Sequence, residues 1–555
     1  MTKITLPTEK QVGHLTLLRQ EREISFTEFN ALSTAEQLEI VRQRRGKEKY
    51  VLLTNAKNAA QLVRQLHPQE IYLTINELGP HDSTELLALA SPEQVTLLLD
   101  LDCWEGDQLS PVLSLGWLEL LLGTGEEQAC RLVRELEPEL LALFLKKHLT
   151  IVRGIEVYDD DDAENANRLE SIYDIDYTSE DAAKVIGALL KLWQEQEQDS
   201  YLLIMEMIRG EILSVLEEDV FQTRNNRLLD LGIMPAGEAR ALYAYIDPAH
   251  FSVGGKTDFQ LESENIQNPK ALLALAEPYN LLADILAAGI RHETACELVF
   301  LVNRKMSADA IDFSAAKQVH EALQSTYDNL NLALEFLAGS DAGKAEEIFT
   351  TTYLIRLFQL GHSLLHQRIT KAQKIADGFI YSYLDYPELL FIDSLLQTPA
   401  CFYRAASADK PSDLQAIRTL KDLQLIDRRL EQISSLEELF SLRLPFHLSA
   451  HEEQSEQPSL SQIYITAIAN QLLERPYTPA ALTVSDLYSL RQKTIVNDQL
   501  DENFRKYFHQ QLNREHDNCA FFGAFCLELW EDNLLSTELS ETSLPMSAFI
   551  LDGSK

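Results

Sequence analysis

The chain has 555 residues, and its 86 acidic against 48 basic side chains give a formal charge of −38. A field of this sign repels nucleic-acid phosphates and anionic lipid surfaces, so we expect neither a nucleic-acid nor a membrane partner. Hydrophobic residues make up 45% of the chain, which is enough for sizeable cores, and only 21 glycines and 18 prolines interrupt a majority of helix formers.

The location follows from the first residues and from cysteine usage. The start lacks the charged, apolar and small-residue regions of a signal peptide, and no stretch reaches the roughly 18 uninterrupted apolar residues of a membrane span. Six cysteines are scattered along the chain without a CxxC pair, which is typical of reduced thiols. We therefore expect a cytoplasmic protein.

Proline sets the rhythm of the first third. Residues 1–60 are predicted as an N-terminal helical arm, and a repeat region follows over 61–153. There Pro68, Pro80 and Pro92 recur at equal spacing, and proline suits the first helical position. The helices between them have two to three turns at most and are too short to persist alone, so the sequence predicts an α-solenoid of stacked short helices.

The rest of the chain continues as helical blocks, and the fold class is predicted to be all-α. A long amphipathic helix is expected over residues 201–220. The predicted segments are an acidic linker over 154–168, a helical block over 169–250, a loop over 251–268, a helical block over 269–407 and a C-terminal helical block over 408–555.

A group of opposite charges stands between the apolar segments of the second block. Arg224 and Arg227 follow soon after three carboxylates, of which Glu218 is the central one. Two arginines near carboxylates form an ion-pair network or hold an anionic ligand through two parallel hydrogen bonds. Pairing within the chain is the favoured interpretation, and a ligand or partner contact through these side chains is the alternative.

A second group surrounds Trp104, with carboxylates at Asp100, Asp102, Glu105 and Asp107. Oxygen ligands at alternate positions are typical of a calcium loop, but Pro111 stands where the terminal glutamate would be needed. We interpret the segment as a turn between helices, with solvated carboxylates and Trp104 as a packing anchor. Asp102 and Trp104 are kept as candidate contacts for a partner.

Histidine and cysteine provide the candidates for metal chemistry. His362 and His366 are one helical turn apart, which is half of a metal site, although no third ligand follows from the spacing. Further candidates, each interpreted as core or loop residues, are His447 with His451, His516 with Cys519 and Cys526, and His292 with Cys296. No basic neighbour that would activate Cys296 is identified.

Several of these segments resemble an uncharacterised bacterial family, a domain of unknown function, over most of the chain. The likeness is carried by residues 100–107 (DLDCWEGD), 224–232 (RNNRLLDLG), 244–248 (AYIDP) and 356–363 (RLFQLGHS). The resemblance implies one family unit and assigns no activity. Residues 62–149 are also similar, in repeat style alone, to the cytosolic helical domain of bacterial magnesium channels.

Three functions are compatible with these observations. The repeat architecture and the acidic field favour a non-enzymatic helical scaffold that binds a protein or peptide partner, with no cofactor predicted. The alternatives are a metal-dependent enzyme that uses His362 and His366, and a divalent-cation sensor that uses the acidic stretches. The sequence does not fix the oligomeric state.

Overall fold

The computed structural model is an all-α protein with a few short strand pairs. It describes residues 23–153, 173–257, 275–403, 414–446, 457–515, 519–535 and 548–552, together with 4–5, 9–12, 15–18, 273 and 448. The chain divides into two compact units, residues 1–361 and 362–555. The boundary falls inside the predicted block 269–407, so that block contributes to both units.

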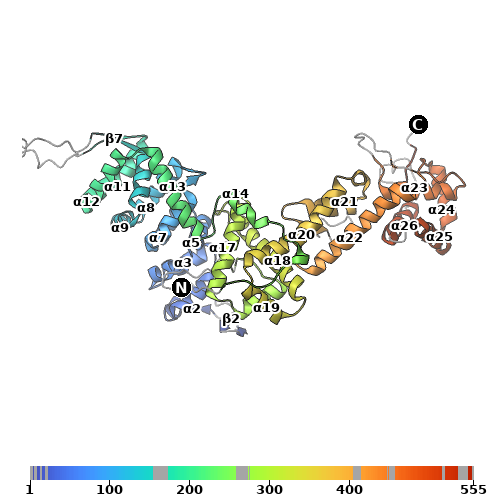
Figure 1. Ribbon diagram of the computed structural model, residues 1–555, viewed down its shortest axis with the longest axis horizontal. Helices are drawn as coiled ribbons and strands as arrows, with labels where there is room; N and C mark the ends of the chain where they lie inside the picture. Colours follow the sequence, from blue (N-terminus) through green and yellow to red (C-terminus); the bar gives the residue numbers. More distant parts are fainter. Residues whose placement is uncertain are drawn as a thin grey trace, which may run out of the picture. The chain divides into compact units, whose positions relative to one another are not determined.

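Ten short α-helices follow one another in the first part of the first unit, and Figure 1 labels most of them. They are α1 (Phe26–Phe29), α2 (Thr34–Arg42), α3 (Gly46–Thr54), α4 (Ala59–Arg64), α5 (Pro68–Leu78), α6 (Thr84–Leu89), α7 (Pro92–Asp102), α8 (Pro111–Gly123), α9 (Glu126–Glu135) and α10 (Pro138–Lys146). Proline occupies the first position of α5, α7, α8 and α10, as its missing N–H allows. Of the three equally spaced prolines, Pro68 and Pro92 begin α-helices, whereas Pro80 begins a short 3-10 turn (Pro80–Ser83) that precedes α6.

Three longer helices follow: α11 (Glu180–Gln196), α12 (Gln198–Gly210) and α13 (Leu213–Asp230). The single helix predicted over 201–220 is wrong, because the chain leaves the helical conformation at Glu211 and Ile212, where ψ is 146° and 126°. Gly210 precedes this break and has the weak helix propensity that permits it. The turn allows α12 and α13 to pack separately against α10.

The remainder of the first unit packs around a second apolar core. Its helices are α14 (Ala236–Ala239), α16 (Asn280–Ala288), α17 (His292–Ala308), α18 (Ala316–Ala338) and α19 (Ala342–Thr351), followed by α20 (Leu354–Ala376), within which the unit boundary falls. Figure 1 shows α14, α17, α18 and α19 lying together. Short 3-10 turns stand at Arg240–Tyr243 and Pro248–His250.

Helix α5 joins the two cores of this unit. Its Leu73 belongs to the core of α16–α20, whereas Ile71 and Ile75 belong to the core of the preceding helices. Gln69 and Asn303 exchange two buried side-chain hydrogen bonds of 2.8 and 3.1 Å, which fix α5 to α17. The two cores are thus tied by a satisfied polar pair, which a buried amide requires.

Glycine allows a close contact between two helices of the unit. A Cβ atom placed on Gly361 of α20 would lie 1.9 Å from the backbone oxygen of Asn329 in α18. No side chain fits this distance, so the crossing depends on glycine.

All strand pairs among the described residues are antiparallel and two-stranded. They are β1 (Ile4–Thr5) with β4 (Glu23–Ile24), β2 (Glu9–Val12) with β3 (Leu15–Leu18), β5 (Trp104–Glu105) with β6 (Gln108–Leu109), β7 (Leu149–Arg153) with β8 (Asp174–Tyr177), β9 (Cys401–Tyr403) with β10 (Leu414–Ala416), and β11 (Ile495–Val496) with β12 (Gln499–Leu500). Short strands therefore open the segment predicted as a helical arm, and helices begin only at α1.

The second unit contains α21 (Tyr386–Leu396), α22 (Leu420–Glu438), α23 (Leu460–Leu472), α24 (Val484–Thr494), α25 (Glu502–Glu515) and α26 (Ala520–Leu535), with a 3-10 turn at Phe379–Tyr383 and a π turn at Leu439–Arg443. Its core is aromatic, since Phe504, Phe508 and Phe549 surround the ring of Trp530. Among the described residues, no helix combines the length and the apolar character that a membrane span needs.

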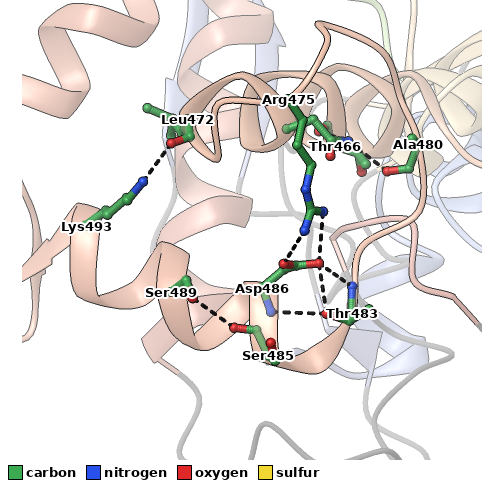
Figure 2. Close-up of polar contacts among 10 residues, drawn as sticks. Thr466, Leu472, Arg475, Ala480, Thr483, Ser485, Asp486, Ser489 and Lys493 are labelled. Carbon is green, nitrogen blue, oxygen red and sulfur yellow. Dashed lines mark hydrogen bonds and ion pairs between the residues drawn. The ribbon is translucent and has the colours of Figure 1, made fainter.

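A bidentate ion pair fixes the loop between α23 and α24 (Figure 2). Arg475 donates to both carboxylate oxygens of Asp486, at 3.0 and 2.7 Å. Asp486 also closes a capping box with Thr483 at the start of α24. The side chain of Arg475 is 44% exposed and that of Asp486 is 10% exposed, so the pair is open to solvent on its arginine side.

Candidate functional site

The candidate site lies where the end of α7 and the β5–β6 hairpin meet the middle of α13. Gly106 takes φ +68° in the hairpin turn, a conformation that glycine adopts without strain. On α13 the side chains of Glu217, Phe221, Arg224 and Leu228 recur every three or four residues and therefore share one helix face. Arg224 on this face, and Arg227 one turn further along α13, lie toward the buried end of α7.

Asp100 is the centre of the site, and its side chain is 0% exposed. Arg227 donates from Nε to Asp100 Oδ2 at 2.7 Å and from Nη2 to Oδ1 at 2.9 Å. Arg227 also donates from Nη1 to Glu137, at the start of α10, at 2.6 Å. Arg224 donates from Nε to the backbone oxygen of Asp100 at 2.8 Å. The two arginines thus join α7, α10 and α13.

Burial raises the pKa of Asp100, and its contacts with the two arginines oppose this shift without cancelling it. Burial alone would lower the pKa of Arg227, but the hydrogen bonds and charges of Asp100 and Glu137 outweigh burial and raise it. Both Asp100 oxygens accept N–H bonds, which fits an ionised carboxylate. Burial, with a smaller effect of the Asp102 and Asp100 charges, raises the pKa of the Cys103 thiol well above its usual value, so this thiol is not activated.

Trp104 packs against the second arginine. The Arg224 guanidinium carbon lies 5.2 Å from the Trp104 ring centroid and 6.0 Å from that of Phe221, a cation–π arrangement. Burial lowers the pKa of Arg224, and the Asp100 charge opposes this shift. Trp104 Nε1 is buried without a hydrogen-bond partner among the described residues. Trp104 is therefore the packing anchor that the sequence predicted.

The prediction of solvated carboxylates in this turn is wrong for two of the four. Asp100 is fully buried, and Asp102 accepts hydrogen bonds of 2.6 Å from both Tyr72 Oη and Trp117 Nε1. An aspartate at the end of α7 would be solvated in an isolated helix, but here neighbouring helices on both sides in the sequence cover it. Asp102 thus anchors α5 and α8 to the end of α7.

A second ion pair lies beside the hairpin. Glu217 Oε1 accepts from the backbone N–H of Leu109 at 2.8 Å and pairs with Lys147 Nζ at 2.6 Å. Glu218, by contrast, accepts a hydrogen bond from Gln222 on its own helix and does not contact the two arginines in any described interaction. The structure therefore separates Glu218 from the group in which the sequence placed it.

Every charged group at the centre of this site is used to join helices. Carboxylates accept from arginines, an indole and a phenol, and the arginines donate to carboxylates and a backbone oxygen. Pairing within the chain, the favoured interpretation of Arg224 and Arg227, accounts for both side chains. Four partners were missed by sequence reasoning: Tyr72, Trp117, Glu137 and Lys147. The charged residues on the buried face of α13 were the signal that could have indicated such partners, because a buried charge needs a partner.

The predicted histidine pair lies on α20. The His362 and His366 rings are stacked, with centroids 5.8 Å apart, and His366 is exposed. Among the residues that the structure describes, no group of three or more His, Cys, Asp or Glu side chains could hold a metal ion. His447, His451, His516 and the acidic run 159–162 lie outside the described residues.

The remaining sequence candidates have ordinary partners. His292 Nε2 lies 3.6 Å from Cys296 Sγ, so the cysteine does have a basic neighbour, contrary to the sequence analysis. Burial and the Glu293 charge nevertheless raise the pKa of Cys296, which is the opposite of activation. Lys256, which follows two glycines, forms an ion pair with Glu297.

The second unit contains a buried acid that sequence reasoning missed. Glu388 Oε1 lies 3.9 Å from Arg429 Nη2, while Glu388 Oε2 and Arg429 Nε are buried without hydrogen-bond partners among the described residues. Burial raises the pKa of Glu388 to about 7; the Arg429 charge opposes this shift and the Asp385 charge adds to it. This acid changes its charge near neutral pH.

These contacts define an all-α protein in which polar and charged side chains join short helices that are far apart in the sequence. The chain belongs to a family of unknown function, DUF6178, whose model matches residues 27–551. No curated protein and no solved structure matches the chain.

Proposed function

We propose that the protein is a non-enzymatic cytoplasmic scaffold whose first unit presents a helical surface to a protein or peptide partner. The observation that carries this proposal is a group of exposed apolar side chains on the segments that meet at the Lys147–Glu217 ion pair.

Three hydrogen-bonded contacts bring separate segments together at this pair. The backbone N–H of Leu109 donates to Glu217, which places the start of α8 beside the start of α13. His148 Nε2 lies 3.1 Å from Ser114 Oγ, which fixes the first turn of α8 to the segment that leads into β7. Lys146 Nζ donates to the backbone oxygen of Ile208, just before the α12–α13 turn. The starts of α8, β7 and α13 are therefore neighbours.

Each of these segments exposes large apolar side chains. Val112 is 80% exposed, Ile212 67% and Val152 61%. We call the full group the apolar junction, and its members are Val112, Leu113, Val152, Ile212, Leu213 and Val215. Single exposed apolar side chains are ordinary, whereas several on adjoining segments are typical of an interaction surface.

Site-specific photo-crosslinking in cells that produce the protein tests this proposal. A photoreactive residue at position 212 is expected to give one defined adduct, and the same residue at position 442 is expected to give none. Leu442 is a suitable control because it is 75% exposed but lies in the second unit. The adduct is expected to weaken in a Val112→Ser background. Equal labelling at both positions, or no adduct at position 212, would overturn the proposal.

A further inference from the structure

We infer that the apolar junction receives a cationic amphipathic segment, a short helix or peptide with apolar residues on one side and lysine or arginine on the other. This inference rests on the proposed scaffold function and adds the chemistry of the partner.

Exposed carboxylates adjoin the apolar side chains. Glu211 stands in the α12–α13 turn itself, next to Ile212. Glu218 and Asp219 follow Val215 by three and four residues, so they share its exposed face of α13. Glu105 and Asp107 are exposed on the hairpin that donates to Glu217. These oxygens offer acceptors at the edge of an apolar surface.

Three described basic side chains of this region are bound to acceptors of the same unit. Lys147 pairs with Glu217, and Lys146 donates to the oxygen of Ile208. Arg209 pairs with Glu206 one turn earlier on α12. The charges of Lys147 and Arg209 are therefore balanced locally, whereas Lys146 keeps its charge beside a neutral oxygen. The five exposed carboxylates outnumber this cation and set the sign of the field at the junction.

The charge of the chain favours the same partner. At −38 the whole chain repels anionic segments and a second copy of itself, while it attracts cations over distances of about the Debye length. Apolar contact supplies affinity in such an interface, and charge complementarity supplies the selection of partner and the rate of encounter. A basic amphipathic helix satisfies both requirements, because such helices dock their apolar face on a complementary surface.

The direct test uses the full chain and three synthetic peptides of about 18 residues, which as helices would be about 27 Å long. One peptide carries leucines on one helix face and lysines on the other, the second has the same composition in scrambled order, and the third replaces lysine by glutamate. Fluorescence anisotropy of labelled peptides is expected to show binding of the first alone, and this binding is expected to weaken as salt rises.

Two pairs of variants separate the contributions. Val112→Ser with Ile212→Ser removes apolar contact and is expected to lower affinity about tenfold or more. Glu218→Lys with Asp219→Lys reverses the local charge and is expected to lower affinity at low salt but much less at high salt. The matched control is Glu346→Lys with Glu347→Lys, two adjacent exposed acids on α19 that change the net charge equally.

The outcomes distinguish the two proposals. If the control pair weakens binding as much as the α13 pair, or if the scrambled or acidic peptide binds equally well, the partner chemistry inferred here is wrong. A crosslinked partner at position 212 that is acidic or neutral would also overturn this inference while leaving the scaffold function intact. Sedimentation that shows a dimer lost in the Val112→Ser with Ile212→Ser variant would instead assign the junction to self-association and overturn the inference.

Discussion

Replacement of Arg227 by methionine tests the central claim that charged side chains hold the first unit together. The change removes both hydrogen bonds to Asp100 and leaves a carboxylate that is 0% exposed without its main partner. Loss of one partner from a buried pair costs about 3–5 kcal/mol. We expect about 3 kcal/mol, because Arg224 remains close, and because loss of the half-exposed Glu137 contact adds at most about 1 kcal/mol.

The second unit supplies a matched control. Arg475→Met removes two hydrogen bonds of similar length from Asp486, but Arg475 is 44% exposed, against 20% for Arg227, and Asp486 keeps its bonds from Thr483. An ion pair that reaches solvent contributes about 1 kcal/mol or less to the free energy of unfolding. Arg227→Met is therefore expected to cost at least about twice as much as Arg475→Met, although each change removes a bidentate pair.

Hydrogen exchange measured by mass spectrometry is the appropriate assay, because it gives opening free energies for peptides of each unit separately. Peptides of α7 and α13 are expected to lose protection in Arg227→Met, and peptides of α24 in Arg475→Met. The double variant Asp100→Asn with Arg227→Met is expected to be more stable than Arg227→Met alone, since it removes the buried charge. Equal costs for the two arginine changes, or a double variant less stable than Arg227→Met, would refute the reasoning.

Three further predictions concern other parts of the chain. Gly361→Ala is expected to destabilise the first unit by about 3 kcal/mol in urea unfolding, because its Cβ would lie 1.9 Å from the Asn329 oxygen. The pKa of Glu388 is about 7 in the folded protein and 4.5 in the unfolded chain. The contribution of Glu388 to the free energy of unfolding is therefore fully present below pH 4.5 and is lost as the pH rises through 7. Between these limits the second unit is expected to lose about 3 kcal/mol, and Glu388→Gln to abolish this dependence. Elemental analysis of purified protein is expected to show no stoichiometric zinc, iron or manganese, and His362→Ala with His366→Ala to leave the metal content unchanged.

Each of these predictions has a control and a contrary result. Gly343→Ala places its Cβ at an ordinary 3.6 Å from Asp341 and is expected to be neutral or stabilising, so equal effects at both glycines would contradict the packing argument. Glu347→Gln, at an exposed acid, is expected to leave the pH dependence intact. One equivalent of metal that is lost with the histidine pair would favour the metal-dependent enzyme, and a melting temperature raised by millimolar magnesium would favour the cation sensor.

Local signals in the sequence predicted the helix starts well. Pro68 and Pro92 each begin an α-helix and Pro80 begins a 3-10 turn, because the constraint acts within one residue of the proline. The break at Glu211 was missed because residues on both sides of it are apolar at helical spacing, and only packing against α10 distinguishes two helices from one.

The site was only partly predictable, because its contacts also depend on packing between distant segments. Arg224, Arg227 and Trp104 were identified from residue type and grouping, but the partner of Arg227 is 127 residues away and nothing local indicates it. Asp102 and Asp100 were predicted to be solvated. That prediction failed because α5, α8 and α13 supply the side chains that cover them, and these side chains are not close to them in the sequence. Glu388 was missed because its pKa depends on the surrounding core and has no local sequence pattern.

The separation of Asp100 from Arg227 has a consequence for synthesis of the chain. At about 5–20 residues per second, a ribosome adds the 127 residues between them in roughly 6–25 s. During that interval Asp100 has been synthesised but Arg227 has not. The short helices of the repeat region therefore cannot bury the Asp100 carboxylate together with its ion-pair partner. The first third of the protein is therefore expected to mature only after α13 has left the exit tunnel, however early its own helices are translated.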